Sequence, residues 1–112
     1  MAKVSFNDRE YEAVLNNFTM YHYGVSVGKK TPIEAINTLS GLKDGYTFEG
    51  QEKLSGLLHH MTKQSMSLED CFTAINDTKT LEVIMSEVES YVSAIVPMNE
   101  ATEKKKTVQQ MT

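Results

Sequence analysis

The most regular hydrophobic pattern of the chain lies near its C-terminus, in residues 81–95. Apolar side chains recur there every three or four positions, and glutamates and serines fill most of the positions between them. An α-helix places such apolar side chains on one stripe, which must be buried against other elements. We therefore predict a helix over residues 78–96 that ends at Pro97. The stripe consists of Leu81, Ile84, Met85, Val88, Tyr91, Val92 and Ile95.

The N-terminal part of the chain carries a second helical pattern. Asn7 and Asp8 can cap a helix, and Gly24 stands where helices commonly end. We therefore predict a helix over residues 8–23, preceded by a short extended piece at residues 4–6. The apolar side of this helix is expected to consist of Tyr11, Val14, Leu15, Phe18, Tyr21 and His22.

A short helix is expected over residues 31–39. Thr31, Pro32 and Glu34 together form a strong start signal. Threonine caps a helix, proline suits its first position, and a glutamate at this spacing can reach back to the cap. The helix is expected to end before Gly41.

Two further helices are expected before the last one. One begins at Thr47 or Phe48, after a turn at Asp44-Gly45. The other follows Ser67, which can cap it. The buried side of the first is expected to consist of Leu54, Leu57, Leu58 and Met61.

These patterns predict an all-α fold, a single-domain bundle of about five helices with short extended segments in some connections. A chain of 112 residues with 40% hydrophobic and 23% charged residues suits one globular domain. We assign residues 1–97 to the helical domain and expect residues 98–112 to form a tail that is flexible or is ordered by a partner. No apolar run approaches the ~20 residues of a membrane span, and no export signal is visible, so we expect a cytoplasmic protein.

The net charge of −4 and the kinds of basic residue bear on the class of partner. Only Arg9 is an arginine, the residue best suited to forked contacts with phosphates and guanine edges. The lysines are scattered except at residues 29–30 and 104–106. This pattern argues against nucleic acid as a partner, and an acidic surface favours basic proteins or peptides.

Two groups of side chains carry candidate chemistry. His59 and His60 are adjacent, whereas helix-borne zinc ligands usually stand four residues apart so that both face one way. Cys71 falls on an inward stripe, and its acidic neighbours oppose formation of the reactive thiolate. We therefore predict no catalytic residue, no metal and no cofactor.

The best candidates for contact with a partner are aromatic and methionine side chains. Tyr21 and His22 complete the apolar side of the first predicted helix, while Tyr23 points elsewhere and is expected to be exposed. The alternative is that these three side chains only close the end of the bundle. Met66 and Met98 fall outside the strongest stripes and suit an adaptable binding surface.

These observations favour a small, acidic, non-enzymatic protein-binding module that regulates, inhibits or helps to assemble a protein partner. Self-association into a homodimer is compatible with the long stripe of the last helix. The small size and the lack of motifs suggest an accessory protein of a bacterium or a bacterial virus. The alternative is a transcriptional regulator of helix-turn-helix type, although its reading helix at residues 31–39 has no arginine or lysine. An enzyme is the least favoured class.

Overall fold

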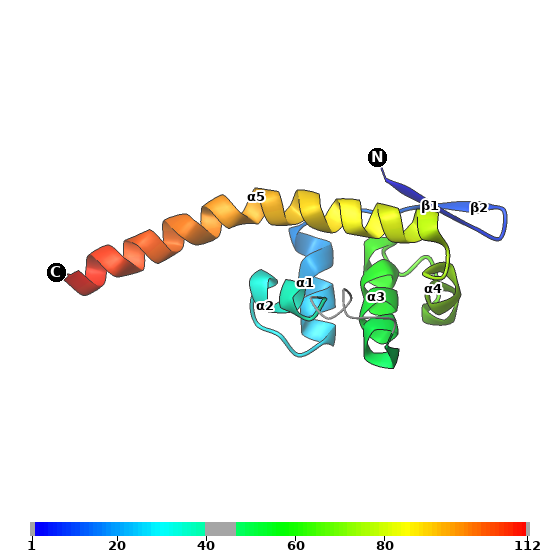
Figure 1. Ribbon diagram of the computed structural model, residues 1–112, viewed down its shortest axis with the longest axis horizontal. Helices are drawn as coiled ribbons and strands as arrows, with labels where there is room; N and C mark the ends of the chain where they lie inside the picture. The colour runs from blue at the N-terminus through cyan, green and yellow to red at the C-terminus, as the bar shows by residue number, and fades with distance from the viewer. Residues whose placement is uncertain (1, 40–46, 112) are drawn as a thin grey trace.

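The computed structural model describes residues 2–39 and 47–111, and the side chains of its last helix as far as Ile95 (Figure 1). The turn predicted at Asp44-Gly45 and the helix end predicted before Gly41 lie outside these residues. The described residues form two strands, β1 (Lys3–Phe6) and β2 (Arg9–Glu12), and the helices α1 (Asn17–Ser26), α2 (Pro32–Asn37), α3 (Phe48–Met61), α4 (Leu68–Ala74) and α5 (Thr78–Met111).

The fold is mostly helical, as predicted, but it opens with a β-hairpin. The extended piece predicted at residues 4–6 is part of β1, whereas β2 and the pairing of the two strands were not predicted. β1 and β2 pair in antiparallel register, with Val4 opposite Tyr11. Asn7 and Asp8 form the two-residue turn, both with positive φ, 50° and 63°. Two consecutive residues of this conformation are typical of a type I′ turn, which asparagine and aspartate tolerate better than most residues.

The predicted helix over residues 8–23 is therefore wrong in its first half. The helix begins at Asn17 because Asn16 is its cap, and its C-terminal end lies at Ser26 rather than before Gly24. The Asn16 side chain accepts a hydrogen bond from the Thr19 backbone N–H at 3.0 Å. The Thr19 hydroxyl accepts one from the Asn16 N–H at 2.8 Å, so two otherwise unpaired donors of the first turn are satisfied.

The predicted starts of the next three helices are confirmed. Thr31, Thr47 and Ser67 are the caps of α2, α3 and α4, and each side chain accepts a hydrogen bond from a backbone N–H three residues on. Glu34 does reach back, but its carboxylate accepts from the Lys30 N–H rather than from the cap residue itself. These short polar signals fix where the helices begin.

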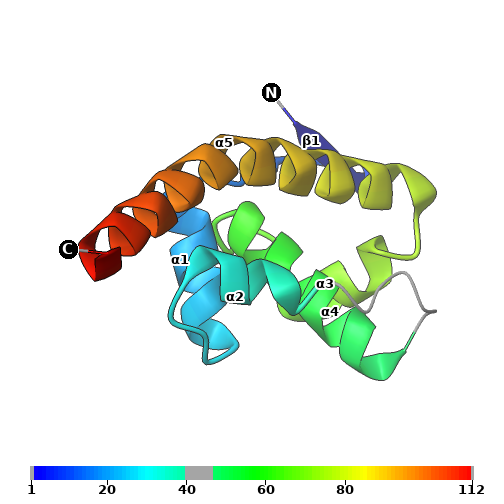
Figure 2. The ribbon, with the colours of Figure 1, turned by 60° about the vertical axis from the view of Figure 1, so that its left-hand side comes forward.

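The last helix is longer than predicted. α5 continues through Pro97 to Met111, so the expected end at Pro97 is wrong. Proline adopts the φ of a helix, but inside one it removes a backbone donor and its ring crowds the carbonyl four residues earlier; a long helix can accommodate both effects by bending. Figures 1 and 2 show the C-terminal part of α5 projecting past the other elements. The proposed role of residues 98–112 as a tail ordered by a partner stays a prediction.

The core lies between α3 and its neighbours. The predicted inward side of α3 is buried, and so are Ile84, Val88 and Tyr91 of α5, whereas Met85 is partly exposed. Figure 1 shows α1, α3 and α4 side by side beneath α5. The backbone N–H of Val14 donates to the Met61 carbonyl at 3.0 Å and so ties the segment after the hairpin to the end of α3. Within the described residues, no helix combines the length and apolar content that crossing a bilayer requires.

Candidate functional site

The candidate reactive groups of the sequence are Cys71 and the adjacent pair His59 and His60. Cys71 is fully buried. Burial and the negative charge of Asp70 raise the pKa of its thiol to about 12, so it stays protonated at neutral pH. Among residues 2–39 and 47–95, no three histidine, cysteine or acidic side chains come close enough to hold a metal ion.

Tyr23 and Met66 do not lie where a partner can reach them. Tyr23 is fully buried, and its hydroxyl lies 2.7 Å from the Thr38 hydroxyl, so the expected exposure of Tyr23 is wrong. Burial raises the pKa of the Tyr23 hydroxyl, and the hydrogen bond to Thr38 lowers it by less. Met66 is also fully buried. The Met98 side chain lies outside the described residues.

The position of Gly24 explains why Tyr23 turns inward. A Cβ added to Gly24 would lie 3.4 Å from the Ala35 Cβ, so α1 and α2 approach closely at this point. This approach places the side of α1 that contains Met20, Tyr23 and Gly24 against the rest of the molecule. Tyr21 and His22, which lie on the other side, are exposed.

The exposed side of α1 is unusually apolar. The side chains of Phe18, Tyr21 and Val25 are 64%, 63% and 58% exposed. Together with His22 they occupy positions i, i+3, i+4 and i+7, which share one face of a helix. We call Phe18, Tyr21, His22 and Val25 the α1 face. A helix that is apolar on all sides is normally covered on all sides.

His22 is the centre of a cluster of rings at this face. Its ring lies 4.5 Å from the ring centroid of Phe18 and 5.2 Å from that of Tyr21, both in edge-to-face geometry. Its other neighbour is His60 of α3, whose ring stacks on it at 6.2 Å. Aromatic rings in such contacts hold one another in place. Each such contact contributes about 0.5–1.5 kcal/mol, so these contacts favour the observed arrangement of Phe18, Tyr21 and His22.

All three histidines of the chain gather at this point. His59 lies next to His60, with ring centroids 5.4 Å apart, and its Nδ1 atom is 2.7 Å from the Met66 carbonyl oxygen. Burial lowers the pKa of His60, and the positive charges of His59 and His22 lower it further. His60 is half-buried and stacks on the exposed His22, so it lies at the border between the core and the α1 face.

A hollow lies on each side of the α1 face. The first, of about 230 Å³, opens between α1 and the end of α3. The second, of about 350 Å³, opens between α1, the loop to α2 and Tyr91 of α5, whose hydroxyl donates to the Asn17 side chain at 2.9 Å. The first is lined by Phe18, Thr19, His22, His60, Lys63 and Gln64. The second includes Tyr21, Val25, Lys29, Lys30 and Pro32 in its lining.

The charge around the α1 face is opposite in sign to the charge of the whole chain. Lys63 lines the first hollow, and Lys29 and Lys30 line the second. No aspartate or glutamate is among the described residues that line either one. The partner class predicted from the net charge, a basic protein or peptide, thus differs from the class that this surface would attract.

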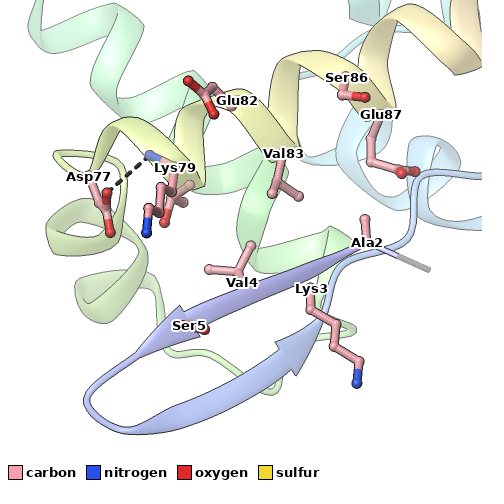
Figure 3. Close-up of a pocket in the computed structure, with 11 residues that line it drawn as sticks. Ala2, Lys3, Val4, Ser5, Asp77, Lys79, Glu82, Val83, Ser86 and Glu87 are labelled. Carbon is pink, nitrogen blue, oxygen red and sulfur yellow. Dashed lines mark hydrogen bonds between the residues drawn. The ribbon is translucent and has the colours of Figure 1, made fainter.

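A larger hollow lies on a different side of the molecule. It measures about 450 Å³ and separates β1 from the first turns of α5 (Figure 3). Figure 3 shows Val4 and Val83 entering it from opposite walls. Lys3 and Lys79 share its lining with Asp77, Glu82 and Glu87, so its charge is mixed. It contains none of the exposed aromatic side chains, and we take the α1 face as the candidate site.

Sequence reasoning found part of this site. Tyr21 and His22 were candidate contact residues and are exposed, whereas Phe18, Val25 and His60 were missed. The usable signal was that α1 has apolar residues on both of its sides, because only one side of a short surface helix can face the core. Comparison of the chain with protein-family models, with curated proteins and with solved structures gives no match.

Proposed function

We propose that the protein is a non-enzymatic protein-binding module and that the α1 face is its binding surface. Such a module acts by occupying a partner, and thereby regulates, inhibits or helps to assemble it. The observation that carries the proposal is the exposure of Phe18, Tyr21 and Val25 within two turns of one helix. Contiguous exposed apolar surface of this kind typically marks an interaction site.

The composition of the face supports the same proposal. Tyrosine and phenylalanine are enriched at the centres of protein interfaces, where they bury large areas with little loss of side-chain entropy. The ring contacts of His22 with Phe18 and Tyr21 favour one arrangement of these side chains in the absence of a partner. Pre-ordering lowers the entropic cost of association.

The proposal is tested with paired surface variants in a quantitative pull-down from native lysate. We expect F18S/Y21S to reduce recovery of a stoichiometric partner at least about tenfold, because each substitution removes an apolar anchor. The matched control is F48S/L68S, which also removes two exposed apolar side chains, from α3 and α4 instead. Both double variants should keep the wild-type melting temperature.

Two results would contradict the proposal. Equal loss of the partner in F18S/Y21S and F48S/L68S would mean that the α1 face has no special role. Full retention of the partner in F18S/Y21S would place the binding surface elsewhere on the molecule.

A further inference from the structure

The surroundings of the α1 face combine apolar contact area with positive charge. Lys63 stands beside Phe18 and His22, and Lys29 and Lys30 stand beside Tyr21 and Val25. All three lysines are exposed. The Lys30 backbone N–H binds the Glu34 carboxylate at 3.1 Å, and Glu34 is the one carboxylate for which the described residues show a contact at this rim. Among the described residues, the side-chain ammonium groups of these three lysines form no ion pair.

We propose that the α1 face binds an acidic amphipathic helix of a partner protein. Its apolar side chains would pack on Phe18, Tyr21 and Val25, and its carboxylates would lie beside the three lysines. This inference rests on the proposed function and names the chemical class of the segment that the module recognises.

The dimensions of the face fit a helix. Phe18 and Val25 are seven positions apart in α1, which is about 10.5 Å along the helix axis. A partner helix with apolar residues at i, i+4 and i+7 presents anchors over the same length. The α1 face is a ridge with a hollow on each side, and side chains that flank the partner's apolar stripe have room in the hollows of about 230 and 350 Å³.

The positions of the lysines fit carboxylates that flank this stripe. Lys63 lies on one side of the ridge, and Lys29 and Lys30 lie on the other. Acidic residues on both borders of a helix's apolar stripe would therefore each meet a cation. The imidazoles of His22 and His60 add polar N–H groups at the first hollow, where a carboxylate can accept from them.

Two other occupants fit the observations less well. A single-stranded nucleic acid would find aromatic rings and lysines here, but a face about 10 Å long spans few phosphates, and the net charge of −4 opposes a long polyanion. A second copy of the chain offers acidic α5 side chains. However, in the part of α5 whose side chains are described, Ile84, Val88 and Tyr91 are buried in the core, and Met85 is the one large apolar side chain exposed by more than a third.

The test uses synthetic helical peptides of about three turns, each with leucines at i, i+4 and i+7. In one peptide the flanking positions are glutamates, and in the other they are lysines. Binding to the full chain is followed by fluorescence polarisation, and the site is located by chemical-shift changes in the protein. We expect the glutamate peptide to bind at least about tenfold more tightly than the lysine peptide and to shift the resonances of α1.

Charge-reversal variants locate the electrostatic part of the interaction. K29E/K63E should weaken binding of the glutamate peptide about tenfold and improve binding of the lysine peptide. The control is K3E/K79E, which makes the same change in net charge at two exposed lysines beside the hollow between β1 and α5. We expect this control to bind the glutamate peptide within about twofold of wild type, because Lys3 and Lys79 line a different hollow from the one beside the α1 face.

The remaining outcomes separate this inference from the proposed function. Preferred binding of the lysine peptide to the α1 face would overturn the acidic class and leave the α1 face as a protein-binding surface. If neither peptide binds but F18S/Y21S still loses the lysate partner, the acidic class is also overturned and the α1 face remains a protein-binding surface. Binding of a single-stranded oligonucleotide at the face, or concentration-dependent self-association lost in F18S/Y21S, would overturn the inference in favour of those occupants.

Discussion

The two sides of α1 have similar side chains and different surroundings. On one side, Met20 and Tyr23 are fully buried and Gly24 packs close to α2. On the other, Phe18, Tyr21 and Val25 lie mostly in solvent. The side that packs on Ala35 stabilises the fold, whereas the exposed side contributes little to it. Apolar surface that does not stabilise the fold is available for association, and this contrast can be measured with matched variants.

The largest difference is expected between two tyrosines of the same helix. Tyr23→Ala should lower the free energy of unfolding by about 3–5 kcal/mol, because it leaves a cavity in the core and removes the hydroxyl contact with Thr38. Tyr21→Ala makes the same chemical change at an exposed position and should alter the free energy of unfolding by no more than about 0.5 kcal/mol. Urea unfolding followed by circular dichroism measures both values.

Similar losses in these two variants would show that the two sides of α1 do not differ as described. Tyr23→Phe refines the comparison, because it keeps the ring and removes only the hydroxyl contact with Thr38. We expect it to cost about 1 kcal/mol, so most of the Tyr23→Ala effect should come from lost packing.

A smaller effect is expected at the start of α1. Asn16→Ala removes the acceptor for the Thr19 N–H and should destabilise the protein by about 1 kcal/mol, whereas Asn16→Ser keeps an acceptor and should recover most of the loss. Urea unfolding of the two variants checks this. An unchanged stability in Asn16→Ala would mean that packing alone positions α1 and its two sides.

The sequence did not predict which side of α1 faces the core. It did predict the caps of α2 and α4 and the buried side of α3. Thr31 and Ser67 act through neighbours in the chain, so local rules find them. With apolar residues on both sides of α1, periodicity cannot choose between them. The choice comes from contacts across the fold, among them the approach of Gly24 to Ala35 and the contact of the Tyr23 hydroxyl with Thr38.

The hairpin was missed for a related reason. Asn7 and Asp8 are favoured both as helix caps and in type I′ turns, so these residues alone do not decide between the two structures. Long-range contacts decide. Val4 is buried in the core, and the Val14 N–H binds the Met61 carbonyl, which favours a turn that sends the chain back along β1.

The candidate site was partly predictable for the same physical reason. Tyr21 and His22 could be identified because aromatic residues gathered at the end of a helix. The contribution of His60 could not, because it depends on α1 and α3 lying side by side, which brings residues 38 positions apart into ring contact. The positive charge at the face is likewise hidden in a chain whose net charge is −4.

The smallest of the expected effects concerns His60, at the border between the two sides. Its pKa is lowered in the folded protein, chiefly by burial, so the unfolded chain binds a proton more readily. Stability is therefore full above the ordinary histidine pKa of about 6.5 and falls as the pH drops from there toward the lowered value. His60→Gln removes this titration, so its stability should fall less than that of wild type between about pH 7.5 and 5.5 in urea unfolding.

The two causes of the His60 shift can be separated, because they respond differently to salt. Burial is the larger cause, and it does not depend on ionic strength, whereas the repulsion from His59 and His22 is screened. Raising the salt concentration should therefore reduce the pH dependence of wild type only in part. If His60→Gln loses as much stability as wild type over this range, His60 is as hydrated in the folded protein as in the unfolded chain. His60 would then be grouped with the solvent-exposed side chains Phe18 and Tyr21 rather than with the buried ones.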